Sequence, residues 1–401
     1  MNYIMAGTEG GPVVVLWKSY LYGENGAKEK AAGKEGDWME ENQRDRIQFW
    51  DILKGIGIVS IVFGHSQNLG IAIRTVYYYH LAIFFFISGY LYNEKRYGDA
   101  PFDFFARRLK NMWVPYFAYG SMFVLLHNLL SWCLLFPSES YYGKKEMLFA
   151  MANTLFLRCP EGPSGAMWFV PLMLAAGTGF TVILWFCRNY LPSSLRSWAA
   201  GTLCIAAGLF GAAISRREIF LSYHLQTALL VIPVYYGGYA VRTWKIPMEK
   251  YITWYGAAAC GGLFYYFLVF TGESVELSAN QIPGGFNFYI ISAAGIYLCC
   301  YGAKCLEKIP KAGKAAALLG KYSFDIMALH FLVFKLCDRI YARIILEPAE
   351  NQGGFPHSYP ELHILYLVLG AVLPVLFAMA ARKAIHCMGR KLRSWAGHPQ
   401  N

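Results

Sequence analysis

Three ionisable residues, Asp51, Lys54 and His65, lie in one of the most apolar stretches of the chain, DILKGIGIVSIVFGHS. On a helix, Lys54 and His65 return to nearly the same face and lie roughly 16 Å apart along the axis. Asp51 lies one turn before Lys54, close to the same line. Ionisable groups on a bilayer-length apolar helix are costly, so this stripe must face protein or water rather than lipid. The spacing therefore predicts a functional groove along the helix.

The residue of the stripe best suited to chemistry is His65. A neutral imidazole can take a proton from an alcohol as a general base, or it can carry an acyl group itself. The alternative is a structural histidine bonded to a neighbouring helix, but the shared stripe with Lys54 and Asp51 favours function. Lys54 and Asp51 are spaced to form an ion pair, and Lys54 is also placed to attract an anionic ligand from the cytoplasm. We predict that His65, Lys54 and Asp51 are catalytic.

A second group of candidates lies in the basic segment FDFFARRLKNMWVPY, which holds Arg107, Arg108 and Lys110. A basic loop on the cytoplasmic side is expected from membrane topology alone. Two adjacent guanidinium groups nevertheless suit the geometry of phosphate, which makes this segment a candidate binding site for an anionic cofactor.

Four further polar or aromatic residues lie in or beside apolar segments: His80, Ser88, Trp168 and His330. Each has a structural alternative, such as a solvated histidine at the interface, a small residue that allows close helix contact, or a tryptophan of the aromatic belt. His80 is expected near the outer surface, toward which His65 also points. We predict that these four residues contribute to substrate binding.

The composition places these residues in a membrane protein. Hydrophobic residues make up 56% of the 401 and charged residues only 15%, too little charge to cover a soluble domain of this size. Windows of about 19 residues identify about ten segments long enough to cross a bilayer. Because lipid leaves no partner for unpaired backbone groups, the predicted class is all-α, a polytopic integral membrane helical bundle. The ten segments are 52–71, 77–92, 112–136, 166–187, 197–214, 219–241, 251–270, 286–305, 322–346 and 362–384.

The distribution of basic residues predicts the orientation. With the N-terminus in the cytoplasm, about 22 Lys and Arg residues lie on the inner side and about 8 on the outer side. Both termini are therefore predicted to be cytoplasmic, in a multi-pass protein of the plasma membrane. The net charge of +11 follows from this bias and from anionic headgroups, so it does not imply a nucleic-acid partner.

The chain divides into one large domain and two short ends. Residues 1–43 are polar and rich in Gly and Lys, and we interpret them as a disordered cytoplasmic extension or as sequence upstream of a start at Met39. Residues 44–390 form the predicted transmembrane domain, and residues 391–401 a cytoplasmic tail. The ten cysteines show no CxxC pair and no metal-type spacing, so we expect small apolar packing residues and no metal site.

Five motifs in order, DILKGIGIVSIVFGH, HLAIFFFISGYLY, RRLKNMWVPY, MWFVPL and YSFDIMALH, resemble the successive signatures of the acyltransferase-3 membrane family. The resemblance covers residues from about 46 to 335 and is strongest to the fucose 4-O-acetylase-like branch. The family's basic residue, ten intervening residues and histidine map onto Lys54 and His65. Most relatives have arginine at the basic position, and lysine lacks the fork that binds phosphate in two places.

The resemblance implies a ten-helix bundle that transfers an acyl group, usually acetyl, from cytoplasmic acyl-CoA to a hydroxyl of a glycan, lipid-linked sugar or cell-wall polymer. It assigns the catalytic role to His65 and places Arg107 and Arg108 near the donor. It implies acetyl-CoA as a donor substrate, with no permanently bound cofactor. The acceptor, the acyl group and the oligomeric state are not predicted beyond this.

Two other functions fit the same sequence features. A transporter or flippase for a sugar or lipid-linked intermediate also needs buried ionisable groups and a basic cytoplasmic side. The second alternative function is that of a membrane domain that serves as a partner or sensing module. Such modules occur fused to an enzyme domain, and none is apparent in this sequence. Direct transfer with His65 as base and transfer through an acyl-histidine both remain open.

Overall fold

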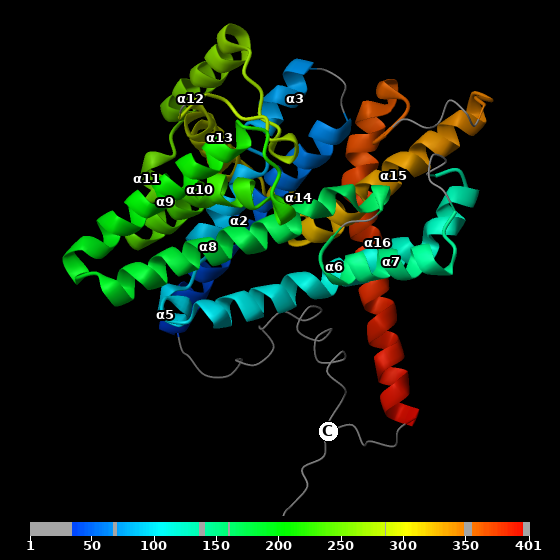
Figure 1. Ribbon diagram of the computed structural model, residues 1–401, viewed down its shortest axis with the longest axis horizontal. Helices are drawn as coiled ribbons and strands as arrows, with labels where there is room; N and C mark the ends of the chain where they lie inside the picture. The colour runs from blue at the N-terminus through cyan, green and yellow to red at the C-terminus, as the bar shows by residue number, and fades with distance from the viewer. Residues whose placement is uncertain are drawn as a thin grey trace, which may run out of the picture.

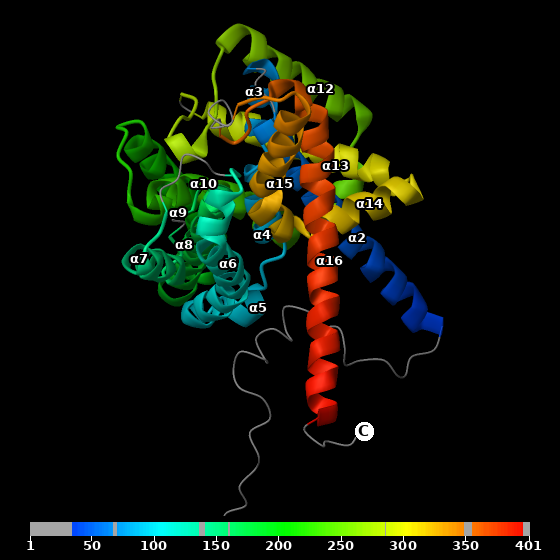
Figure 2. The ribbon, with the colours of Figure 1, turned by 90° about the vertical axis from the view of Figure 1, so that its right-hand side faces the viewer.

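The computed structural model describes residues 34–66, 70–135, 141–158, 161–284, 286–348 and 355–395, with side chains from residue 48 to residue 388. Within these ranges the chain is almost wholly helical, and the sole extended pairing is an isolated bridge between Glu276 and Gln281. This confirms the predicted all-α class. The bundle is shown in two views in Figures 1 and 2.

Each of the ten predicted segments is occupied by a helix or by a pair of consecutive helices. Shorter helices connect them, of which the site uses α5 (Glu94–Tyr97), η2 (Gly162–Trp168) and α14 (Pro310–Lys321). The long elements are α2 (Lys34–Ser66), α3 (Gly70–Tyr77) with α4 (Ala82–Tyr90), α6 (Pro101–Trp132), α8 (Phe169–Tyr190), α9 (Ser193–Ser215), α10 (Leu225–Thr243), α12 (Trp254–Tyr266), α13 (Asn287–Glu307), α15 (Ser323–Ile344) and α16 (His363–Trp395).

Five helical segments of the described ranges are long and apolar enough to cross a membrane: Gly70–Tyr90, Gly162–Tyr190, Ser193–Ser215, Asn287–Glu307 and Pro360–Met388. A sixth is added if α14 and α15, which meet at an angle of 82°, form one broken span. These helices support a multi-pass membrane protein. The count of ten spans and the cytoplasmic location of both termini stay predictions.

The domain boundaries differ in detail from the expected ones. Helix α2 begins at Lys34, so residues 34–43, expected in the N-terminal extension, belong to the first helix. Helix α16 continues to Trp395, into the expected tail, and it extends beyond the packed helices in both views (Figures 1 and 2). Residues 1–33 and 396–401 lie outside the described residues.

Helix α2 lies at the centre of the bundle, where it packs against α3, α4, α13, α14, α15 and α16. Its closest neighbour is α14, because glycines let the two backbones touch. A Cβ at Gly55 would lie 2.1 Å from the Ala316 carbonyl oxygen, and one at Gly320 would lie 1.8 Å from that of Asp51. This contact holds the inner half of α2, including Lys54, against the neighbouring helix.

Helices α4 and α10 make a second crossing of the same kind. A Cβ at Gly89 would lie 1.8 Å from the carbonyl oxygen of Tyr235, and one at Gly238 would lie 1.9 Å from that of Phe86. Small residues at such crossings allow close approach of membrane helices. The crossing fixes the position of α4, which lines the inner cavity described below and is preceded by Leu81 of the outer one.

Candidate active site

Two separate cavities lie against α2, and we name them by the predicted orientation of the chain. The outer cavity has a volume of about 100 Å³ and lies near the C-terminal end of α2. The inner cavity has a volume of about 200 Å³ and lies beside Lys54. The outer cavity is lined by Ile61, His65, Tyr77, His80, Leu81, Ala166, Trp168, Phe169, Glu276, Ser278 and Met327. The inner cavity is lined by Lys54, Phe84, Ile87, Ser88, Leu91, Tyr92, Asn93, Tyr97, Phe104, Arg108 and Tyr235.

The central feature of the outer cavity is a pair of hydrogen-bonded histidines. His65 Nδ1 lies 2.9 Å from His330 Nε2, and the two ring planes differ by 5°. The centroid separation of 5.1 Å equals the bond plus the radii of the two rings, so they meet edge to edge in a common plane. This geometry is that of a well-aligned hydrogen bond rather than a face-to-face stack.

The hydrogen bonds of His330 define the protonation of both neutral rings. His330 Nδ1 lies 2.9 Å from the carbonyl oxygen of Ile326 and 3.0 Å from that of Met327. A carbonyl only accepts, so His330 carries its proton on Nδ1 and its lone pair on Nε2. His65 must then donate from Nδ1, which leaves the lone pair on His65 Nε2. The second histidine thus prepares the first as a proton acceptor.

His330 itself does not contact the outer cavity. Its side chain is fully buried, and Phe331 packs against both imidazoles, with centroids 4.9 Å from His65 and 4.2 Å from His330. The sequence analysis placed His330 among the substrate-binding residues. The structure places it behind His65 on α15, outside the lining of the outer cavity.

His80 and Trp168 line the outer cavity together with His65. His80 Nδ1 donates to the carbonyl oxygen of Val76 at 2.9 Å, which leaves its Nε2 as the acceptor. Trp168 packs against His224 with a centroid distance of 4.7 Å. The outer cavity therefore combines two imidazole acceptors with a large aromatic surface.

Three polar residues of the outer cavity were not predicted from the sequence: Tyr77, Glu276 and Ser278. The hydroxyls of Tyr77 and Ser278 donate to the Glu276 carboxylate, and Ser278 N–H donates to it at 3.2 Å. Burial raises the pKa of the Glu276 carboxyl, because removal from water disfavours its charged form. The segment GESVELSAN is rich in polar side chains, but nothing in the sequence shows that it folds back over α3.

The inner cavity gathers cationic and hydroxyl groups. Arg108 on α6 donates to Ser88 Oγ on α4 at 3.1 Å, and Phe104 lies under its guanidinium. The buried polar atoms here that have no partner among the described residues include Arg108 Nε and the Tyr235 hydroxyl. Buried donors are costly when unpaired, so these atoms favour an anionic ligand in the cavity.

The remaining predicted residues lie at or near the inner cavity. Lys54 lines it and donates to Asp51 at 3.0 Å, with both side chains roughly a quarter exposed. Asp51 lines neither cavity and lies at the far end of the stripe from His65. Arg107 is half-buried and Lys110 exposed on other faces of α6, outside the lining of the cavity. Ser88, predicted to bind substrate, lies with Arg108 in the inner cavity.

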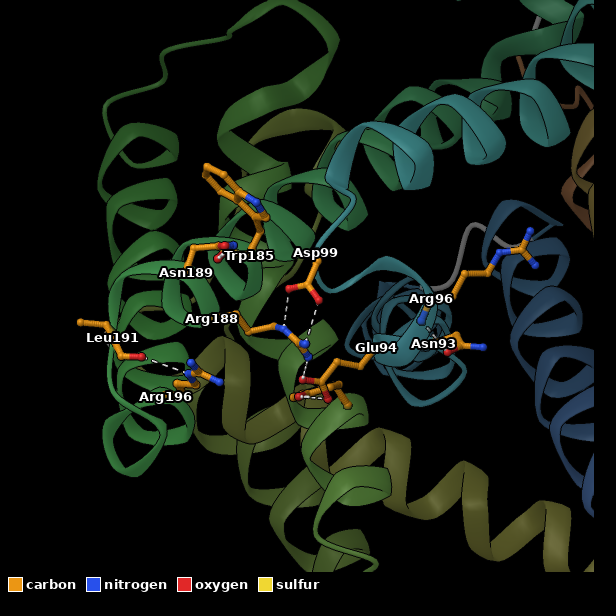
Figure 3. A network of polar contacts seen from close by, with 10 residues as sticks. Asn93, Glu94, Arg96, Asp99, Trp185, Arg188, Asn189, Leu191 and Arg196 are labelled. Carbon is orange, nitrogen blue, oxygen red and sulfur yellow. Dashed lines mark hydrogen bonds and ion pairs between the residues drawn. The ribbon is translucent and has the colours of Figure 1, made fainter.

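A polar network connects the helices beside the inner cavity (Figure 3). Arg188 at the end of α8 donates twice to Asp99 at 2.9 Å and once to Glu94 at 3.1 Å. The Tyr239 hydroxyl on α10 donates to the other oxygen of Glu94 at 2.7 Å. A guanidinium that binds a carboxylate with two parallel bonds is geometrically specific. The network therefore ties α5, which carries Tyr97 of the cavity, to α8 and α10.

A larger cavity, of about 520 Å³, lies elsewhere, against α10 and α13. Its lining is almost wholly apolar, and its ionisable groups are tyrosines and one cysteine. It therefore offers no acid, base or cation for chemistry. In the described ranges no three His, Cys, Asp or Glu side chains are arranged to hold a metal ion.

One family of known proteins matches the chain. The profile of the acyltransferase-3 family, described as an acyltransferase domain, matches residues 47–383, well over half of the chain. No curated protein and no solved structure matches the chain. The match does not distinguish the fucose 4-O-acetylase-like branch, which stays a prediction. It does confirm the family resemblance of the five sequence motifs: the chain belongs to the acyltransferase-3 family.

Proposed function

We propose that the protein transfers an acetyl group from cytoplasmic acetyl-CoA to a hydroxyl of a surface glycan, lipid-linked sugar or cell-wall polymer. Its family makes it a membrane acyltransferase, and donor, acceptor and base are the further steps of the proposal. The observation that carries them is the hydrogen bond from His65 Nδ1 to His330 Nε2 beside the outer cavity. This hydrogen bond leaves His65 Nε2 with a free lone pair, so that it can act as a base.

The inner cavity is the proposed entry for the donor. Acyl-CoA is a polyanion, and the cavity offers Lys54 together with the unpaired Arg108 Nε. Arg107 and Lys110 lie on the same helix as Arg108 and provide further positive charge at its surface. The pantetheine arm then extends along α2 toward His65, a distance of roughly 16 Å by helix rise.

In the proposed reaction, His65 Nε2 takes the proton of the acceptor hydroxyl as its oxygen attacks the thioester carbonyl. The carbon–sulfur bond breaks, the acetyl group stays on the acceptor oxygen, and the CoA sulfur leaves and receives the proton from His65. When His65 is protonated, its Nδ1–H bond to His330 becomes charge-assisted and therefore stronger. The pair thus stabilises the charge that develops during transfer.

The outer cavity is the proposed place of the acceptor hydroxyl. Glu276 and His80 Nε2 are acceptors for neighbouring sugar hydroxyls, and Trp168 offers an aromatic face. A cavity of about 100 Å³ holds the reacting part of a sugar rather than a whole glycan, so the remainder would extend outward.

The test is transfer by the purified protein from radiolabelled acetyl-CoA to de-O-acetylated surface polysaccharide. We expect His65→Ala to reduce turnover by about 10²- to 10⁴-fold, the range for loss of a general base, while acetyl-CoA binding is unchanged. His386→Ala, at an exposed histidine of α16, is the control. Wild-type turnover in His65→Ala would refute the proposal, and a trapped acetyl-histidine without acceptor would replace the base by a nucleophile.

A transporter of sugars or lipid-linked intermediates is the second candidate, because the chain has buried ionisable groups and a cationic inner side. The two functions differ in their need for a donor. Uptake by proteoliposomes in the absence of acyl-CoA would favour transport. Release of CoA that depends on added polysaccharide would favour acyl transfer.

A further inference from the structure

The two cavities are closed off from each other, although the proposed reaction needs groups from both. They share no lining residue. Phe84 lines the inner cavity, whereas its neighbours Leu81 and Phe169 line the outer cavity. Helix α2 passes both, with Lys54 at the inner and His65 at the outer cavity. Donor and base therefore cannot meet along this path until the side chains between the cavities move.

The barrier is formed by aromatic rings. Phe84 and Phe169 meet edge to face, with centroids 5.9 Å apart and planes at 67°. Phe84 lines the inner cavity and Phe169 the outer one, so this contact lies between the two cavities. Phe84 is only partly buried, whereas Phe85 beside it is fully buried. The ring of Phe84 is thus the one with free space next to it.

Beside Phe84, the face of α2 that carries Lys54 and His65 has a glycine, Gly57, and therefore no side chain. Gly57 lies one turn after Lys54 and two turns before His65, and a Cβ there would lie 3.0 and 3.1 Å from ring atoms of Phe84 and 2.8 Å from Ile83. The ring of Phe84 and Cγ2 of Ile83 therefore occupy the place that a side chain at position 57 would take. If the ring turned into the inner cavity, a continuous passage along α2 would open beside Gly57.

We propose that Phe84 is a movable barrier between the donor site and His65, and that Gly57 provides the passage which the ring closes. The inference rests on the proposed function, since it concerns access of the thioester to His65. With the ring in place, water of the outer cavity is kept from the thioester. The ring must move for the acyl group to reach His65, so Phe84 determines whether the donor is transferred or hydrolysed.

The test measures release of free CoA from acetyl-CoA alone, without acceptor. In Phe84→Ala the passage stays open, and we expect hydrolysis to rise at least about fivefold. Water then replaces the acceptor hydroxyl: His65 Nε2 takes its proton, its oxygen attacks the carbonyl, and acetate and CoA are released. Phe86→Ala, which removes a ring of α4 facing the large apolar cavity, is the matched control and should hydrolyse at the wild-type rate.

A second variant tests the passage itself. Gly57→Ala places a methyl group in the path, and we expect acyl transfer to fall at least about tenfold with acetyl-CoA binding retained. Combining it with Phe84→Ala should restore part of the transfer, because the ring atoms 3.0 and 3.1 Å from the methyl group are removed, whereas Ile83 Cγ2 at 2.8 Å remains. Gly261→Ala, at an α12 position whose Cβ would meet nothing within 4 Å, controls for the added methyl group.

The outcomes separate this inference from the proposed function. If transfer depends on His65 but hydrolysis by Phe84→Ala and transfer by Gly57→Ala both equal wild type, the barrier is refuted and the function stands. If Phe84→Ala raises hydrolysis equally in the presence of His65→Ala, the barrier stands and His65 is not the base. Transfer by Gly57→Ala that Phe84→Ala fails to restore would also refute the passage beside Gly57.

Discussion

At the scale of single residues, two histidines share a hydrogen bond beside the outer cavity, from His65 Nδ1 to His330 Nε2. His65 touches the outer cavity, whereas His330 lies behind it and donates its own Nδ1 proton to the backbone. The lone pair of His330 is therefore committed to His65. In a histidine, the hydrogen bond made by one ring nitrogen determines whether the other nitrogen carries the proton.

Replacement of His330 should affect turnover rather than donor binding. In His330→Ala, the Nδ1 proton of His65 loses its acceptor, and the ring is free to reorient or to change tautomer. We expect kcat to fall by about 10²-fold, the typical cost of a misplaced catalytic group, with KM for acetyl-CoA unchanged. In His330→Gln the amide oxygen can accept the same bond, so part of the activity should return. Equal losses in both variants, or a change confined to KM, would contradict the positioning role.

At the scale of the elements, α4 is held by its crossing with α10. A Cβ at Gly238 would lie 1.9 Å from the Phe86 carbonyl oxygen and 2.8 Å from the backbone nitrogen of Tyr90. Backbone atoms cannot turn aside as a side chain can, so the two helices would have to separate. The adjacent Gly237 faces open space, since a Cβ there would meet nothing within 4 Å.

These neighbouring glycines make a matched pair for measurement. We expect Gly238→Ala to lower the free energy of unfolding by about 1–3 kcal/mol, as overpacking typically does, and to weaken acetyl-CoA binding because Tyr235 and Ser88 are displaced. Gly237→Ala should stay within about 1 kcal/mol of wild type, the range for Gly to Ala in a helix. Thermal unfolding in detergent reports the first effect and isothermal titration the second. Equal stabilities would show that the α4–α10 crossing is less rigid than the structure indicates.

Elements also show where sequence patterns stop being informative. Hydropathy identified 322–346 as one span, which α15 occupies, but it did not show that α14 precedes α15 at an angle of 82° with the bend at Tyr322. Likewise 77–92 was taken as one segment, but the helical span begins at Gly70 and includes α3. Hydropathy averages over about 19 residues and does not register a change in direction within that window.

At the scale of the whole molecule, the orientation in the membrane determines which cavity meets which substrate. The basic residues predict that the inner cavity opens to the cytoplasm, where acyl-CoA is made. The outer cavity and the segment with Glu276 would then face the outside. In both views α3 and α5 lie at opposite ends of the bundle (Figures 1 and 2).

Cysteine labelling can test this orientation directly. Single cysteine substitutions at the exposed positions Gly284 and Lys311 probe the predicted outer and inner sides of the membrane, respectively. In intact cells we expect Gly284→Cys to react with a membrane-impermeant maleimide, and Lys311→Cys to react only after permeabilisation. The unaltered chain provides the background from its native cysteines. The reverse pattern would invert the topology and move the donor to the other cavity.

The sequence alone determined the class of the protein, the places of its helices and its family, and it identified His65 as the candidate base. These follow from local properties: hydropathy over a helix length, the periodicity that aligns Lys54 with His65, and motifs read in order. Only the tertiary structure decided that His330 bonds to His65, that Glu276 joins the outer cavity, and that Phe84 separates the two cavities. Such contacts link residues as far as 265 positions apart, and no local pattern encodes the packing that brings them together.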